Sequence, residues 1–225
     1  MKRVIVAIDG PAGAGKSTVS KGVAERLGLS LVDTGAIYRC VALAAIRAGL
    51  PLDSDADLER LLDTLDIGFR VENGRNRVLL NGEDVSDAIR TPEISRGASI
   101  VSARPVVRAG LLELQRRLAR SAPGGAVMEG RDIGTVVFPD ADVKFFLTAS
   151  DEVRARRRHA ELTARGVQIS LEQVLEDQRQ RDLQDTTRDL APLVAAPDAH
   201  HLDASALGPD EVIHRIVELV ERLRR

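Results

Sequence analysis

The sequence predicts an α/β protein built on a five-stranded parallel sheet flanked by helices. Short apolar runs alternate along the chain with longer segments of helical periodicity, which is typical of parallel strands joined by crossover helices. The run at 143–147 is mostly apolar, as expected of a strand buried on both faces. The expected strands are residues 4–9, 30–33, 126–129, 143–148 and 200–204.

Several helices have recognisable start signals. The Ser-Leu-Glu-Gln run at 170–173 is a capping-box pattern ahead of a helix that extends to about residue 184. Pro105 and Pro209 each fit the first turn of a helix, and the helix after Pro105 is expected to end near residue 121. An acidic pair at 151–152 is favourable at the start of a further helix, which carries the arginines at 154–158.

One stretch interrupts the alternation of strands and helices. Residues 67–71 and 77–80 have the pattern of two hairpin strands, joined by a loop that contains Gly74. We therefore expect residues 62–103 to form a small β-containing subdomain inserted into a single domain, 1–225. The alternative is a loop decoration that has no function of its own.

Composition excludes several classes of partner. The chain has 225 residues and a net charge of −2, which gives no general attraction to nucleic acid or to an anionic membrane. Aromatic residues are only 2% of the chain, too few for a stacking surface for single strands. Cys40 is the single cysteine, so an internal disulfide is impossible. No apolar run approaches ~20 residues, and the first is short, so we expect a cytoplasmic protein without signal peptide or membrane partner.

The strongest motif lies directly after the first expected strand. Residues 10–17, Gly-Pro-Ala-Gly-Ala-Gly-Lys-Ser, fit the phosphate-binding P-loop in its required strand–turn–helix context. Glycines let several backbone N–H groups point into one hollow, and the following helix adds its positive end. Lys16 is placed to reach the β and γ phosphates of a nucleoside triphosphate, and the Ser17 hydroxyl to bind Mg²⁺. The residues expected at this site are Gly10, Pro11, Ala12, Gly13, Ala14, Gly15, Lys16, Ser17 and Thr18.

The rest of the sequence narrows the class of P-loop protein. Neither Lys21 nor Lys144 is followed two residues later by Asp, so the guanine-reading element of GTPases is missing. The Leu-Ser-Gly-Gly-Gln signature of ABC transporters is also absent. A small P-loop kinase is the class that remains, and such an enzyme needs an acceptor pocket.

Three polar clusters are candidates for that pocket. Residues 33–39 and 129–132 each begin where an expected strand ends, which is where ligands bind in an open α/β sheet. A third cluster, 181–188, lies near the end of an expected helix. Each contains an arginine that can hold a phosphate through two hydrogen bonds: Arg39, Arg131 and Arg188.

Taken together, these motifs resemble the bacterial cytidylate kinases, a family of P-loop nucleoside monophosphate kinases. The resemblance rests on residues 10–18, 33–39, 129–141 and 191–193, and it extends into 80–86 and 89–93. It implies transfer of the γ-phosphate of ATP to CMP or dCMP with Mg²⁺, in pyrimidine nucleotide metabolism. It also implies a monomer with the fold of a nucleoside monophosphate kinase. The insertion at 62–103 would be the part that binds the monophosphate, and residues 151–170 would be a short lid.

The resemblance further implies roles for individual residues. The CMP pocket would comprise Thr34, Tyr38, Arg39, Ser99, Arg108, Arg131, Asp132, Arg181, Asp185 and Arg188. Ser99, Arg108 and Asp132 would face the base, and Arg181 and Asp185 would reach the ribose. The acceptor phosphate would be held by Arg39, Arg131 and Arg188. The catalytic residues would be Lys16, Arg131, Arg188, Arg157 and Arg158, with Arg154 in contact with ATP.

The chemistry of these residue types is consistent with such a reaction. The acceptor oxygen belongs to a phosphate that is already anionic, so positioning and charge neutralisation suffice without a general base. A carboxylate at Asp132 can accept from the cytosine amino group, whereas uracil presents the opposite polarity there. Two alternatives stay open: another small-molecule P-loop kinase, in which Asp33 would assist an attacking alcohol, and a nucleotide-binding regulator without transfer activity.

Two further features are ambiguous in the sequence. Arg154, Arg157 and Arg158 share one helix face, which fits either a lid over ATP or a solvated basic face beside acidic neighbours. Glu129 directly precedes the Gly-Arg-Asp run and is long enough to reach Mg²⁺ through a water. The sequence leaves that contact open.

Overall fold

The computed structural model describes residues 3–72 and 75–224, which divide into two compact units. The first unit comprises the chain up to Leu31 and again from Ala122 onward. The second unit is Val32–Ser121, and the insertion expected at 62–103 lies inside it. We describe each unit separately.

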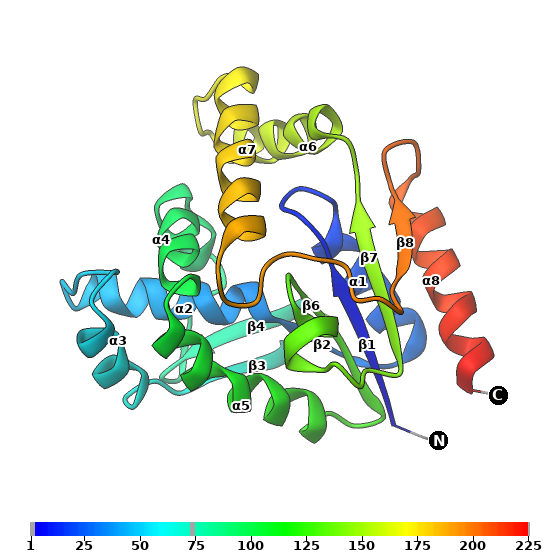
Figure 1. Ribbon diagram of the computed structural model, residues 1–225, viewed down its shortest axis with the longest axis horizontal. Helices are drawn as coiled ribbons and strands as arrows, with labels where there is room; N and C mark the ends of the chain where they lie inside the picture. The colour runs from blue at the N-terminus through cyan, green and yellow to red at the C-terminus, as the bar shows by residue number, and fades with distance from the viewer. Residues whose placement is uncertain (1–2, 73–74, 225) are drawn as a thin grey trace. The chain divides into compact units, whose positions relative to one another are not determined.

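The main sheet has five strands in the order β2-β6-β1-β7-β8 (Figure 1). The pairings β1–β6, β1–β7 and β7–β8 are all parallel, which confirms the predicted fold class. Each strand begins and ends within one residue of its expected position. The bounds are β1 (Val4–Asp9), β2 (Ser30–Asp33), β6 (Gly125–Gly130), β7 (Val143–Thr148) and β8 (His200–Asp203).

The core of the first unit forms where two helices pack on this sheet. Helices α1 (Lys16–Leu27) and α8 (Pro209–Arg224) contact each other and bury their apolar sides against the strands. Val23 of α1 and Ile216 of α8 are fully buried in the same cluster as Phe145 of β7. The helix predicted after Pro209 is therefore confirmed, and its apolar side is the one that packs.

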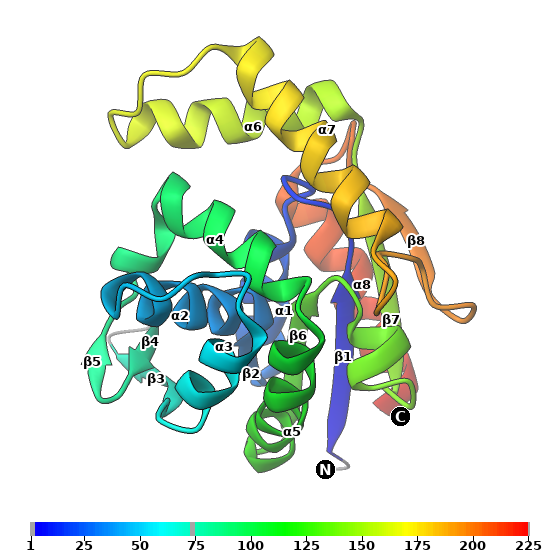
Figure 2. The ribbon, with the colours of Figure 1, turned by 60° about the vertical axis from the view of Figure 1, so that its left-hand side comes forward.

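A helical pair follows β7 in the same unit. Helices α6 (Asp151–Ala164) and α7 (Leu171–Thr187) lie against each other, as Figure 2 shows in yellow-green and yellow. Ser150 caps α6 and Ser170 caps α7, because each hydroxyl accepts a hydrogen bond from the backbone three residues later. Leu162 and Val174 form a small core between the helices. The predicted capping signal at 170–173 is confirmed.

The second unit has a core of its own. Its antiparallel sheet pairs β3 with β4 and β4 with β5, which confirms the predicted hairpin. Gly74 of the predicted hairpin loop lies outside the described residues. The elements are α2 (Thr34–Arg47), α3 (Asp55–Leu62), β3 (Ile67–Glu72), β4 (Arg75–Leu80), β5 (Glu83–Asp84), η1 (Ala88–Arg90), α4 (Pro92–Ser102) and α5 (Pro105–Ser121). Ile37 and Val41 of α2 are fully buried in this core.

None of the helices in the described ranges combines the length and apolarity that crossing a membrane requires.

Candidate active site

The P-loop connects the end of β1 to the start of α1. Gly13 and Gly15 have φ values of 75° and 96°, in the left-handed region that favours glycine. At Gly10, with φ of 148°, a Cβ would collide with the carbonyl oxygen of Leu147. The loop thus needs its glycines, and it has the strand–turn–helix context that the motif requires.

Lys16 is buried at the base of this loop. Its ammonium donates to the carbonyl oxygens of Gly10 and Pro11, at 2.7 Å each. Burial, reinforced by the Arg131 cation, lowers the pKa of Lys16 to about 7, although Glu129 and Asp9 oppose the change. An anionic phosphate bound in the loop would raise that pKa again, because it favours the charged form.

Ser17 and Glu129 bring two oxygen ligands together. The Ser17 hydroxyl donates to Glu129 Oε1 at 2.9 Å, and Glu129 pairs in register with Ile8 of the neighbouring strand. A hydroxyl and a carboxylate are the hard oxygen donors that Mg²⁺ prefers, and Mg²⁺ in kinases takes its remaining ligands from water and phosphates. The donor set therefore fits Mg²⁺. Over residues 3–72 and 75–224, no cluster of three His, Cys, Asp or Glu forms a separate metal site.

The arginines and carboxylates predicted around the acceptor converge in the first unit. Arg131 Nε donates to Asp185 Oδ2 at 2.8 Å. The Arg188 guanidinium lies 3.7 Å from Asp185 Oδ1 and 3.9 Å from Asp132 Oδ1. Burial would raise the pKa of Asp185, but Arg131, Arg181 and Arg188 outweigh it and hold that pKa below its usual value. Three guanidinium groups thus lie around Asp185, and they supply several N–H donors of the kind that bind a phosphate.

The predicted lid arginines make unequal contacts. Arg154 is only 4% exposed, and its guanidinium donates to Ala12 O at 2.9 Å and to Asp182 Oδ2 at 2.7 Å. It also bonds to Ala149 O and Asp151 at the start of α6. Its side chain therefore joins α6 and α7 to the backbone of the P-loop.

The other two lid arginines differ from Arg154 and from each other. Arg157 donates to Ala204 O at 2.8 Å and to Ala14 O of the P-loop at 3.4 Å. Arg158 pairs with Glu161 of its own helix at 2.8 Å. Two of the three predicted arginines therefore hold P-loop carbonyls.

In the second unit, predicted site residues cluster around α2. The Arg108 guanidinium lies over the Tyr38 ring, 5.6 Å from its centroid, which is a cation–π contact. Arg39 donates to Ile89 O at 3.3 Å, and Thr34 is buried at the first position of the helix. Ser99 lies on α4, which packs against α2.

Asp33, the residue that would assist an attacking alcohol in the alternative kinase, caps α2. Its Oδ1 accepts from the backbone N–H of Ala36 at 3.0 Å. A capping carboxylate at this position is explained by the local structure of the helix. The contact gives no support to a role in proton removal.

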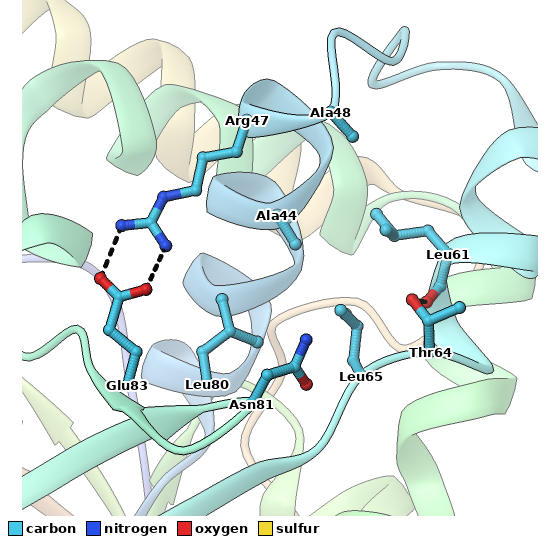
Figure 3. Close-up of a pocket in the computed structure, with 9 residues that line it drawn as sticks. All are labelled: Ala44, Arg47, Ala48, Leu61, Thr64, Leu65, Leu80, Asn81 and Glu83. Carbon is cyan, nitrogen blue, oxygen red and sulfur yellow. Dashed lines mark hydrogen bonds and ion pairs between the residues drawn. The ribbon is translucent and has the colours of Figure 1, made fainter.

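A hollow of about 360 Å³ opens elsewhere in the second unit, between α2, α3 and the end of β4 (Figure 3). Leu61, Leu65 and Leu80 line it, and the Arg47–Glu83 pair, with hydrogen bonds of 2.7 and 2.9 Å, lies at its side. None of the predicted site residues lines this hollow. It carries no part of the candidate active site.

Two acidic residues to which the sequence interpretation gave no individual role are central to the first unit: Asp9, and Asp182 of the third polar cluster, 181–188. Asp9 ends β1, and its two oxygens accept from the backbone N–H groups of Ile133 and Gly134, at 2.8 and 2.7 Å. Asp182 accepts from Arg154, as described above. An acidic residue directly before the first P-loop glycine is the one sequence signal that pointed to Asp9. Asp182 was included only as a member of the cluster 181–188, and nothing in the sequence indicates its contact with Arg154.

Comparison with known proteins agrees with these features. The family model described as Cytidylate kinase matches residues 6–222. A protein named Cytidylate kinase from Geobacter sulfurreducens is 55% identical over 222 residues, which is 99% of this chain and 94% of that protein. A protein of the same name from Syntrophotalea carbinolica is 50% identical, and the match covers 97% of this chain and 92% of that protein.

Among solved structures, an uncharacterized protein from Eubacterium ventriosum superposes with a TM-score of 0.54. It is 12% identical, and the match covers 97% of this chain and 99% of that one, so the likeness concerns the fold alone. The family model and the two named relatives span almost the whole sequence. The chain belongs to the cytidylate kinase family.

Proposed function

We propose that this chain transfers the γ-phosphate of ATP to CMP and dCMP, giving CDP or dCDP and ADP. The observation that carries the proposal, beside family membership, is the cluster in which Asp185 holds Arg131 and Arg188. This cluster begins directly after β6, the strand beside the one that leads into the P-loop. A P-loop for the donor and a second cationic cluster within one unit support a reaction between two phosphates.

On the acceptor side, three arginines would bind the 5′-phosphate: Arg39, Arg131 and Arg188. Ser99, Arg108 and Asp132 would recognise the cytosine, and Arg181 and Asp185 the ribose. Thr34 and Tyr38 complete the proposed set. The Tyr38–Arg108 contact supports the assignment of the base, because it fixes a guanidinium that can donate to N3 or O2 of cytosine.

On the donor side, the P-loop backbone from Gly10 to Thr18 and the Lys16 ammonium would bind the triphosphate. Ser17 would hold Mg²⁺ directly and Glu129 would do so through a water, an assignment supported by their 2.9 Å hydrogen bond. When bound, Mg²⁺ supplies charge neutralisation at the β and γ phosphates. Arg154 would support ATP binding indirectly, because its hydrogen bond to Ala12 O holds the P-loop backbone in place.

Catalysis in this proposal depends on position and charge. Lys16, Arg131 and Arg188 would neutralise the transferring group, with Arg157 and Arg158 joining them from a lid at 151–170. No side chain needs to remove a proton, because the attacking phosphate oxygen is already anionic. The insertion at 62–103 would belong to the part that binds the monophosphate.

We also propose a monomer that acts on small nucleotides, as the family resemblance implies. From the composition and the short apolar runs we propose a cytoplasmic protein that has no nucleic-acid or membrane partner.

An acceptor panel tests the proposal. The purified protein is assayed for ADP release with ATP, Mg²⁺ and one of CMP, dCMP, UMP, AMP or shikimate. CMP and dCMP should be turned over at least ~10-fold faster than UMP, because each mismatched buried polar group costs about 1–3 kcal/mol. Fast release with UMP but not CMP would refute the cytosine assignment, and tight ATP binding without any turnover would favour a regulator.

A further inference from the structure

The segment that follows β6 is held by one buried carboxylate from the neighbouring strand. Asp9 ends β1 and pairs in register with Gly130, the last residue of β6. It is 4% exposed, and its oxygens accept from the N–H groups of Ile133 and Gly134. These are the first two amides of η2 (Ile133–Val137), a single π-helical turn. Asp9 therefore caps this turn from a strand more than 120 residues earlier in the chain.

The turn has no cap from its own sequence. Asp132 occupies the N-cap position, but its side chain makes no capping hydrogen bond. Its carbonyl oxygen instead accepts from Val136 and Val137, at 2.9 and 3.2 Å. The backbone of Asp132 is thus part of the turn that Asp9 holds, so the directions of Asp132 and of the adjacent Arg131 depend on that contact.

The packing around this contact is close. A Cβ at Gly134 would lie 3.0 Å from Lys144 Cδ and 3.4 Å from Asp9 Oδ2. Lys144 of β7 is itself buried, and its Nζ donates to Pro139 O at 2.6 Å and to Asp198 at 2.9 Å. The segment between β6 and β7 is therefore fixed at its start by Asp9 and near its end by Lys144.

We propose that Asp9 is a positioning residue for phosphoryl transfer, which fixes Arg131 and Asp132 relative to the P-loop. The inference rests on the proposed function, in which those two residues bind the acceptor nucleotide. The backbone of Asp9 leads directly into Gly10 of the P-loop while its side chain holds the acceptor segment. One residue thus sets the spacing between the donor loop and the acceptor groups, and a misplacement of about 1 Å at such a site can cost on the order of 100-fold in rate.

The first test is Asp9→Asn. The amide keeps the size of the side chain, but its NH₂ group cannot accept, so one of the two backbone amides loses its partner. We expect kcat/KM for CMP to fall by about 10- to 100-fold. The Kd of a non-hydrolysable ATP analogue should change less than ~3-fold, because the P-loop backbone itself is unaltered.

The matched control is Asp142→Asn. Asp142 Oδ2 accepts from the backbone N–H of Ile5 at 2.8 Å, so it makes the same kind of contact near the other end of β1. It lies outside the proposed site, and the kinetics of its variant should equal those of the unmodified protein.

A second variant, Gly134→Ala, changes the other partner of the contact, the turn that Asp9 caps. It keeps the inference testable if Asp9→Asn does not fold. Gly134→Ala should lower kcat/KM for CMP in the same selective way, whereas Gly208→Ala, where a Cβ would meet nothing within 4 Å, should not. Unaltered CMP kinetics in Asp9→Asn or Gly134→Ala would overturn the inference, and so would an equal loss of ATP-analogue affinity. If the unmodified protein turns over no CMP, the proposed function itself is wrong. The assay of the unmodified protein therefore distinguishes failure of the proposed function from failure of this inference.

Discussion

Replacement of Arg154 by alanine tests whether this side chain supports the P-loop or contacts ATP. Arg154 is almost completely buried, and it donates to two backbone carbonyls, Ala12 O and Ala149 O, and to two carboxylates. A hydrogen bond from a charged group contributes about 1.5–3 kcal/mol, so the two carbonyl contacts alone amount to at least about 3 kcal/mol. Asp182 and Asp151 are 21% and 43% exposed, so water compensates much of their loss.

We therefore expect Arg154→Ala to lower the free energy of unfolding by about 3 kcal/mol, measured by urea denaturation with a common m-value. Arg156→Ala is the matched control on the same helix. Its guanidinium makes one 3.2 Å bond to Glu152 O on the exposed surface, so its variant should stay within about 0.5 kcal/mol of the unmodified protein.

Arg154→Lys separates the two roles further. A lysine keeps the charge but cannot reproduce the planar fork that reaches both the loop carbonyl and Asp182. If Arg154 acts by supporting the P-loop, Arg154→Ala should also bind an ATP analogue more weakly. Arg154→Lys should then recover less than half of the stability and less than half of the affinity that Arg154→Ala loses. A loss in Arg154→Ala below about 1 kcal/mol, combined with weak ATP-analogue binding that lysine restores, would refute the positioning role.

Three other predictions follow from the same geometry. Burial lowers the pKa of Lys16 to about 7, so binding of an ATP analogue at pH 7.5 should take up protons, seen by calorimetry in buffers of different ionisation enthalpy; zero uptake would contradict this. Burial raises the pKa of Asp9 from 3.8 to about 6, with Asp132 and Lys16 facing it, so its stabilising contribution is complete below pH 3.8 and is lost as the pH rises through 6. Relative to Asp9→Asn, the unmodified protein should lose about 3 kcal/mol of unfolding free energy between pH 3 and pH 7; a constant difference would contradict this. Arg131→Ala should lower kcat at least ~100-fold with little change in ATP-analogue affinity, and an unchanged rate would remove Arg131 from the acceptor site.

The strands and the P-loop could be predicted because their signals are local. An apolar run such as that of β7 and the turn residues beside it determine a strand within a few positions, and the glycines of the P-loop are required by their own backbone angles. The caps at Ser150 and Ser170 are equally local, since each hydroxyl meets a backbone amide three residues later.

The contacts that organise the candidate site could not be predicted, because they join distant segments. Asp9 and Gly134 are 125 residues apart. The pattern of apolar residues along the sequence does not predict that the chain after β6 returns to the end of β1. The sequence predicts one helix face for Arg154, Arg157 and Arg158, but the acceptors of Arg154, Ala12 O and Asp182, come from a loop 142 residues earlier and a helix 28 residues later. A helical face of arginines gives no sign of which member is buried.

Transfer of a labelled γ-phosphate tests the central claim most directly. The protein is incubated with Mg²⁺, CMP and ATP that carries a radioactive γ-phosphate, and the labelled products are separated by chromatography. The account predicts that the label appears in CDP, with UMP a poor acceptor in a parallel reaction. Label that appears only as inorganic phosphate, or that enters UDP faster than CDP, would contradict a site that transfers the γ-phosphate of ATP to CMP.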